Sequence, residues 1–139
     1  MTDLWPVEDR NWEMSLGLAG YLRAVADAVG VPAEGTTFEI SDTATAYVAL
    51  ARRWSARPSR DLMLVWSERT GWAVSVETDP AEAPITIARL HGDPLPKPET
   101  VARFVADAVD HRRGGAQSPA APTPSTRAVL ARGLARYIT

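Results

Sequence analysis

Apolar residues at helical spacing predict an amphipathic helix near the start of the chain. They recur at intervals of four, three and four residues, which places them on one face: Leu18, Leu22, Val25 and Val29. Ser15 is a typical N-cap residue, so we expect the helix to begin there. Gly30 favours the left-handed conformation in which helices end, and Pro32 prevents the helix from resuming.

A second apolar stripe predicts another helix after Pro98. Its members follow the spacing i, i+3, i+4, i+7 and i+8: Val101, Phe104, Val105, Ala108 and Val109. Pro98 suits the first turn of this helix, because that turn needs no backbone N–H donor.

Between the two helices, five segments are rich in β-branched and aromatic residues and are bounded by Gly, Pro, Asp or Ser. They are residues 36–41, 45–52, 61–67, 72–78 and 84–90. The connections between them are too short for the crossover helices that parallel strands require. We therefore expect an antiparallel meander of four or five strands, with Gly71 able to take positive φ in the turn after the third.

These elements predict an α+β fold. Two amphipathic helices and one sheet bury their apolar faces most simply as a two-layer sandwich, with both helices on one face of the sheet. The domain would span residues 15–113 and follow an irregular lead, residues 1–14. Residues 114–125 form a linker rich in Pro, Ala, Ser and Gly, and residues 126–139 form a tethered tail helix.

The predicted tail helix has an apolar side and a basic side. Its members are Leu130, Leu134, Tyr137 and Ile138 on the apolar side, and Arg132 and Arg136 on the basic side. A helix of this length is marginally stable alone. We therefore expect these residues to dock the tail on its own body or on a partner, with the arginines as electrostatic guides.

Charge is distributed unevenly along the chain. Residues 112–139 contain five arginines and no acid, whereas residues 1–111 contain the other 10 basic residues and all 17 acidic ones, which gives −7. An acidic body disfavours nucleic acid. The arginines of residues 51–60, which surround Trp54, nevertheless leave open an alternative role as a nucleic-acid-associated factor that also uses the tail.

The composition indicates a cytoplasmic protein without a membrane segment. The chain has no cysteine, and its acidic N-terminal residues do not resemble a secretory signal. No apolar run approaches the roughly 20 residues that cross a bilayer.

Motifs that carry chemistry are absent from the sequence. The two histidines, His91 and His111, are not part of a metal-binding pattern, and no nucleophile elbow, Walker loop or dinucleotide fingerprint occurs. We therefore assign no catalytic residue and no metal ligand, and we expect no cofactor.

Two tryptophans, Trp66 and Trp72, flank the predicted hairpin turn. If a four-residue loop joins Ser67 to Trp72, Trp66 lies one rung away from the direct partner of Trp72, and the two rings point to opposite faces. One ring would then lie beside Tyr47 in an apolar patch on the uncovered face, suited to a partner or a dimer. The alternative is that both rings belong to the core.

Four segments resemble a family of small actinobacterial proteins classed as a domain of unknown function. They are "GLAGYLRAVADAVGVPAEG", "DTATAYVAL", "DLMLVWSERTGWAVSVETDP" and "VARFVADAV". The resemblance covers about residues 16–111 and does not extend to the lead or the tail. It implies no activity and no catalytic residues, so it leaves the function open.

The leading hypothesis is a non-enzymatic protein-interaction or regulatory module. It would bind a partner, or a second copy of itself as a homodimer, through the exposed sheet face and the tail helix. A second hypothesis is a small-molecule-binding protein or enzyme, with a pocket lined by Trp54, Trp66, Trp72 and His91.

Overall fold

The computed structural model describes residues 7–54, 57–77, 85–90, 92, 95–110 and 127–138. The elements in chain order are α1 (Val7–Val29), a 3₁₀ turn η1 (Ala33–Gly35), β1 (Thr36–Ile40), β2 (Ala44–Trp54), β3 (Arg57–Ser67), β4 (Gly71–Val76), β5 (Ile85–Arg89), α2 (Pro98–Asp110) and α3 (Arg127–Ala135). The predicted linker, residues 114–125, lies outside the described residues.

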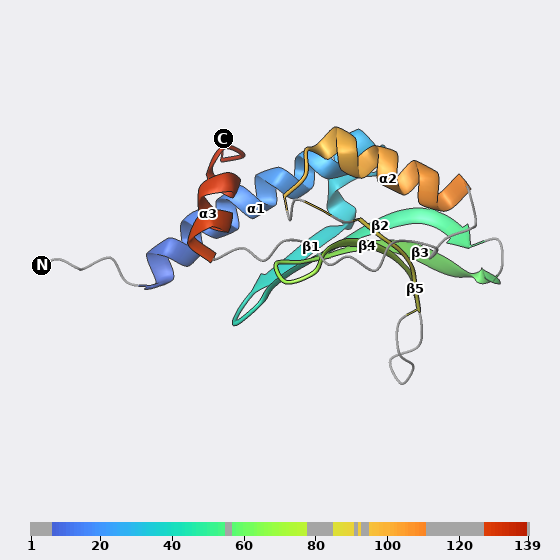
Figure 1. Ribbon diagram of the computed structural model, residues 1–139, viewed down its shortest axis with the longest axis horizontal. Coiled ribbons are helices and arrows are strands. Elements are labelled where there is room, and N and C mark those ends of the chain that lie inside the picture. The colour runs from blue at the N-terminus through green and yellow to red at the C-terminus, as the bar shows by residue number, and fades with distance from the viewer. Residues whose placement is uncertain are drawn as a thin grey trace, which may run out of the picture.

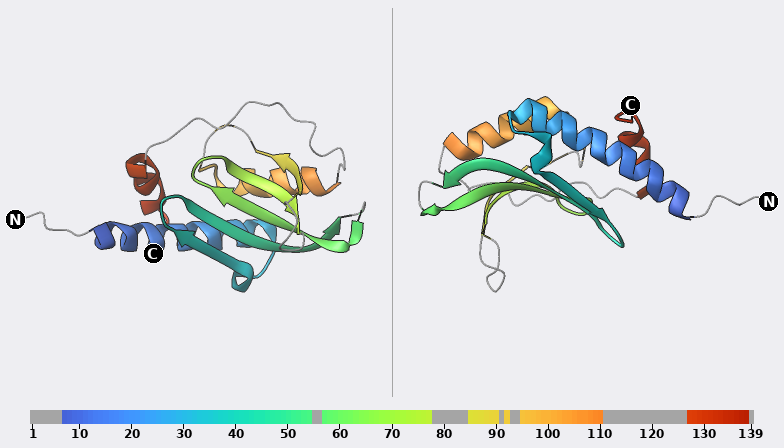
Figure 2. Two further views of the ribbon diagram at one scale, coloured as in Figure 1. Left: turned by 90° about the horizontal axis from the view of Figure 1, so that it is seen from below. Right: turned by 180° about the vertical axis from the view of Figure 1, so that it is seen from behind.

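The five strands form one antiparallel sheet in the order β1-β2-β3-β4-β5. Each strand pairs with the next one along the chain, which confirms the predicted meander. Helices α1 and α2 lie over one face of this sheet (Figure 1). The opposite face, seen from below in Figure 2, has no described helix in front of it. The α+β sandwich predicted from the sequence is therefore confirmed.

The core lies between the helices and the covered face of the sheet. Paired strand positions supply its floor; Val48 pairs with Leu64, and Leu64 pairs with Val74, and all three are buried. Helix α1 contributes its apolar stripe from above, with Leu18 and Val25 fully buried. Along each strand, residues that face the helices alternate with residues on the opposite face of the sheet, because side chains in a strand have a period of two.

Helix α1 begins at Val7, so the predicted start at Ser15 was wrong. Met14 accounts for part of the difference, because it lies four residues before Leu18 and is 2% exposed. It therefore extends the buried stripe by one turn. The contact of that stripe with the core outweighs the local capping preference of a serine.

The hairpin between β3 and β4 has a shorter loop than we expected. Ser67 pairs with Gly71, which leaves a three-residue loop, and Gly71 has φ of +76°. The N–H of Thr70 donates to the carbonyl of Ser67 at 3.2 Å, as in a type I turn followed by a left-handed residue. The prediction for Gly71 is confirmed, whereas the predicted four-residue loop was wrong.

The shorter loop changes the position of the two tryptophans. Trp66 and Trp72 are direct cross-strand partners and therefore lie on the same face. Both rings are almost completely buried, with centroids 6.4 Å apart. The expectation that they point to opposite faces was wrong, and both belong to the core.

Candidate functional site

The domain has two candidate contact surfaces, and the first is the docking site of α3 on α1. Leu130 and Leu134 of α3 are 2% and 0% exposed, and α3 lies beside the N-terminal half of α1 (Figure 1). The apolar side predicted for the tail therefore faces the body of its own chain. Tyr137 is half-buried against the same core, whereas Ile138, Arg132 and Arg136 are exposed.

Two glycines let the two backbones approach closely. A Cβ atom at Gly17 would lie 2.6 Å from the carbonyl oxygen of Leu134, and one at Gly20 would lie 2.0 Å from the carbonyl oxygen of Tyr137. Positions three apart on a helix share a face. Gly17 and Gly20 therefore form a shallow seat on α1, which is filled by the end of α3 at Leu134 and by Tyr137 just after it, and we call it the glycine seat.

A chain of aromatic rings links this docking site to the sheet. The ring of Tyr137 packs edge-on against the ring of Tyr21, with centroids 4.9 Å apart. The centroids of the Tyr21 and Trp72 rings are 6.1 Å apart. The hydroxyl of Tyr21 donates to the carbonyl of Pro96 at 2.6 Å and accepts from Nε1–H of Trp72 at 3.1 Å. Tyr21 therefore couples the tail, α1, the hairpin and the segment before α2.

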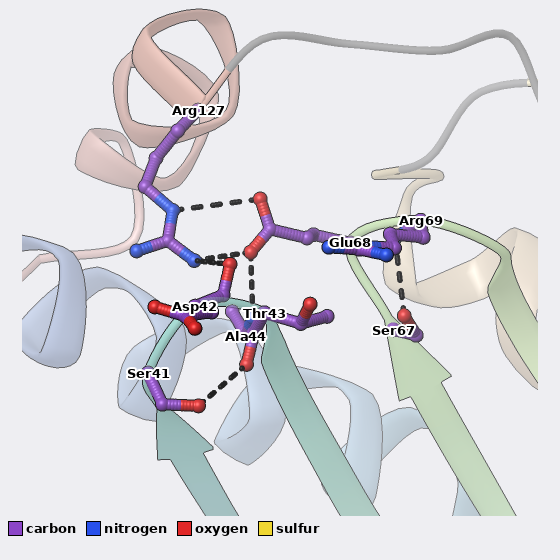
Figure 3. A network of polar contacts seen from close by, with 8 residues as sticks. All are labelled: Ser41, Asp42, Thr43, Ala44, Ser67, Glu68, Arg69 and Arg127. Carbon is purple, nitrogen blue, oxygen red and sulfur yellow. Dashed lines mark hydrogen bonds and ion pairs between the residues drawn. The ribbon is translucent and has the colours of Figure 1, made fainter.

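Figure 3 shows a polar network at the other end of α3. The guanidinium of Arg127 forms an ion pair with the carboxylate of Glu68, in the turn between β3 and β4, and also donates to the carbonyl of Asp42 at 3.2 Å. Glu68 accepts a further hydrogen bond from the N–H of Ala44 at 2.5 Å. Arg127, the first residue of α3, is thus bound to two turns at one end of the strands, the turn between β1 and β2 and the turn between β3 and β4.

The electrostatics of this network favour the ionised form of Glu68. Burial by itself would raise the pKa of the Glu68 carboxyl. The hydrogen bonds from Arg127 and Ala44, together with the positive charges of Arg127 and Arg69, outweigh burial and hold that pKa below its ordinary value. The ion pair with Arg127 is therefore intact at neutral pH.

Acid should loosen the docking of α3. Because the pKa of Glu68 is lower in the folded chain, its contribution to stability is fully present above the unfolded value, near 4.5, and is lost as pH falls through the folded value. NMR resonances of the Leu134 methyl groups should therefore shift toward exposed values below about pH 4.

A matched pair of variants separates this effect from general acid sensitivity. Glu68→Gln should weaken the docking of α3 by about 1 kcal/mol at neutral pH and remove the acid step below pH 4. Glu39→Gln, at an exposed position on β1, should retain the step. A step of unchanged size in Glu68→Gln would show that another group controls the tail.

The second surface is the open face of the sheet, opposite the helices. Its central row crosses all five strands, from Thr37 through Tyr47, Val65 and Ala73 to Arg89. The adjacent row contains half-buried Ala49 and Met63, followed by buried Ser75 and exposed Thr86. The centre of this face is therefore apolar, although an uncovered face of an antiparallel sheet ordinarily carries polar residues.

Acidic residues lie at one end of the open face. Burial raises the pKa of the Tyr47 hydroxyl, and the negative charges of Glu77 and Asp61 raise it further. The shift strengthens the ordinary preference of the tyrosine hydroxyl for its protonated form, in which it is a hydrogen-bond donor. Glu77 and Asp61 lie side by side, since the N–H of Glu77 donates to the carbonyl of Asp61 at 2.8 Å.

The candidate residues named from the sequence do not form one pocket. Trp66 and Trp72 fill the core below the helices, whereas Tyr47 lies on the open face. His91 and the side chain of Trp54 lie outside the described residues. Sequence reasoning missed Gly17, Gly20, Tyr21, Glu68 and Arg127; among them, only Tyr21 carried a local signal, since it lies three residues after Leu18 and four before Val25.

The described part of the chain gives two further findings. No group of three or more acidic or histidine side chains there could hold a metal ion. Nor does any helix in it combine the length and the apolar character that crossing a membrane requires.

Comparisons with known proteins identify one family. The model of a family of unknown function, DUF6292, matches residues 21–107. No curated protein matches, and no solved structure does either. The matched residues contain the open face and both tryptophans, whereas the glycine seat and α3 lie outside them.

Proposed function

This chain belongs to the DUF6292 family of unknown function, and from that premise we propose that it is a non-enzymatic protein-interaction module that pairs with a second copy of itself through the open face of its sheet. The observation that carries this proposal is the apolar centre of that face. Tyr47, Met63 and Val65 lie together there on β2 and β3, and no described helix covers them. An apolar centre within a polar rim is the usual composition of a protein interface.

The rim of the open face favours a second copy as the partner. Arg89 lies on the border strand β5, while Asp61 lies within β3 and Glu77 follows the end of β4. In an isologous dimer both copies use the same surface, so residue i of one copy contacts residue j of the other, and j contacts i. One face must therefore carry both members of every charge pair. The open face contains both signs of charge and satisfies this condition.

Sedimentation equilibrium of the full chain tests the proposal. We expect a reversible dimer that Val65→Lys weakens at least about tenfold, because a charge would enter the apolar centre. Thr37→Lys is the matched control: it adds the same charge in the same row, at the exposed edge strand β1, and should leave the dimer largely intact.

Charge reversal tests the orientation of the pair. Arg89→Glu and Glu77→Arg should each weaken the dimer, and the two reversed chains together should form a mixed dimer. A chain that stays monomeric up to about 1 mM would contradict the proposal, since that limit leaves less than about 4 kcal/mol of association free energy.

We also propose a regulatory role for the tail. The glycine seat is a site shaped for one turn of helix, and helix-in-groove recognition is a common way of binding partners. A partner helix that replaced α3 on α1 would release the tail, and the open face would remain accessible on the other side of the sheet. Both roles are proposed for the cytoplasm, in keeping with a chain without cysteine.

A further inference from the structure

A cavity of about 370 Å³ lies on the helix side of the sheet, between the end of α1, the end of β2 and α2. This volume is within the range of small-ligand pockets. Four of the lining residues have short side chains that leave the space open: Ala28, Ala51, Ala102 and Ala106. Val29, Leu50 and Val105 supply apolar contact surface within it.

One wall of the cavity is the carbonyl end of α1. The N–H groups of Gly30 and Val31 both donate to the carbonyl of Ala26, at 2.8 and 2.9 Å. The carbonyls of Ala28 and Val29 receive no hydrogen bond from any described residue, and the residue four places after Ala28 is Pro32, which has no N–H. These free acceptors, at the negative end of a helix, favour an ammonium group.

A positive charge is supplied by Arg52, which also lines the cavity and could bind a negatively charged group. Its side chain is exposed and forms no ion pair or hydrogen bond within the described ranges. Arg52 follows Ala51, whose φ of +57° is unusual for a residue other than glycine, at an irregularity in the pairing of β2 with β3. Such bulges redirect side chains, and backbone strain of this kind concentrates at functional sites.

We propose that this cavity binds a free amino acid with an apolar side chain. The ammonium group would bind the carbonyls at the end of α1, and the carboxylate would bind Arg52. The side chain would contact Val29, Leu50 and Val105. This ligand site is independent of the proposed dimer, because Leu50 belongs to the buried core on the helix side of the sheet.

Isothermal titration of the full chain with L-leucine tests the site. We expect saturable binding that Arg52→Gln weakens at least about tenfold and that Ala106→Phe abolishes by filling the cavity. Both positions are exposed, so both variants should fold, which thermal unfolding would verify. Arg103→Gln is the matched control, since it removes an exposed arginine of α2 that does not line the cavity.

Two analogues test the two charged contacts separately. Leucinamide lacks the carboxylate and N-acetylleucine lacks the ammonium group, so each should bind at least about tenfold more weakly than leucine. These analogues also distinguish a free amino acid from the end of a peptide, which presents only one of the two charges. Equal binding of either analogue would overturn the assignment, as would the absence of leucine binding at about 10 mM.

Discussion

Replacing Trp72 with alanine is expected to lower the free energy of unfolding by about 3–5 kcal/mol. The ring is 1% exposed and packs between Tyr21 and Trp66. Its removal leaves a large cavity below α1 and deprives the Tyr21 hydroxyl of a hydrogen-bond donor. Denaturation by urea, followed by far-ultraviolet circular dichroism, would measure the loss.

Two comparison variants separate the packing of Trp72 from its hydrogen bond. Trp72→Phe keeps an aromatic ring but loses the donor, and should cost less than the alanine variant, about 1–3 kcal/mol. Trp12→Ala removes a ring that is 64% exposed, and should change stability by less than about 0.5 kcal/mol. Equal effects of Trp72→Ala and Trp12→Ala would contradict the structure of the core.

The strand order was predictable because short connections permit little else. The length of the loop between β3 and β4 was not predictable, and a difference of one residue in that length changed the position of the tryptophans. Pairing Ser67 with Gly71, rather than with Trp72, moves Trp66 to the same rung and face as Trp72. A shift of one residue in a strand exchanges its two faces. The sequence of the turn permits both loop lengths, and only the packing of both rings beneath α1 selects one.

The docking site of the tail was only half predictable. The spacing of Leu130 and Leu134 showed which side of α3 would be buried, since helical periodicity is a local signal. The seat itself depends on residues distant in the chain: Gly17 opposite Leu134, and Glu68 opposite Arg127. A glycine inside a helix ordinarily indicates only a loss of helix propensity, so its use as a contact surface emerges from the tertiary structure.

Gly20→Ala is expected to release α3 from α1. The new Cβ atom would lie 2.0 Å from the backbone carbonyl oxygen of Tyr137, a distance that no side-chain rotation can relieve. Each leucine of α3 that leaves its buried contact forfeits about 1.5–3 kcal/mol of apolar burial. Trypsin should therefore cleave the tail faster at Arg132 in α3 and at Arg136 just after it, because proteolysis follows the population of the open form.

The same substitution should have the opposite effect on a chain that ends at residue 113. Removing the tail removes the three atoms nearest to the new methyl group, all of which belong to Tyr137, and alanine is favoured over glycine inside a helix by about 1 kcal/mol. Gly20→Ala should therefore stabilise the shortened chain while it destabilises the docking of α3 in the full chain. A loss of stability in both chains would trace the effect to α1 or the core, and would remove the glycine seat as the feature that holds the tail.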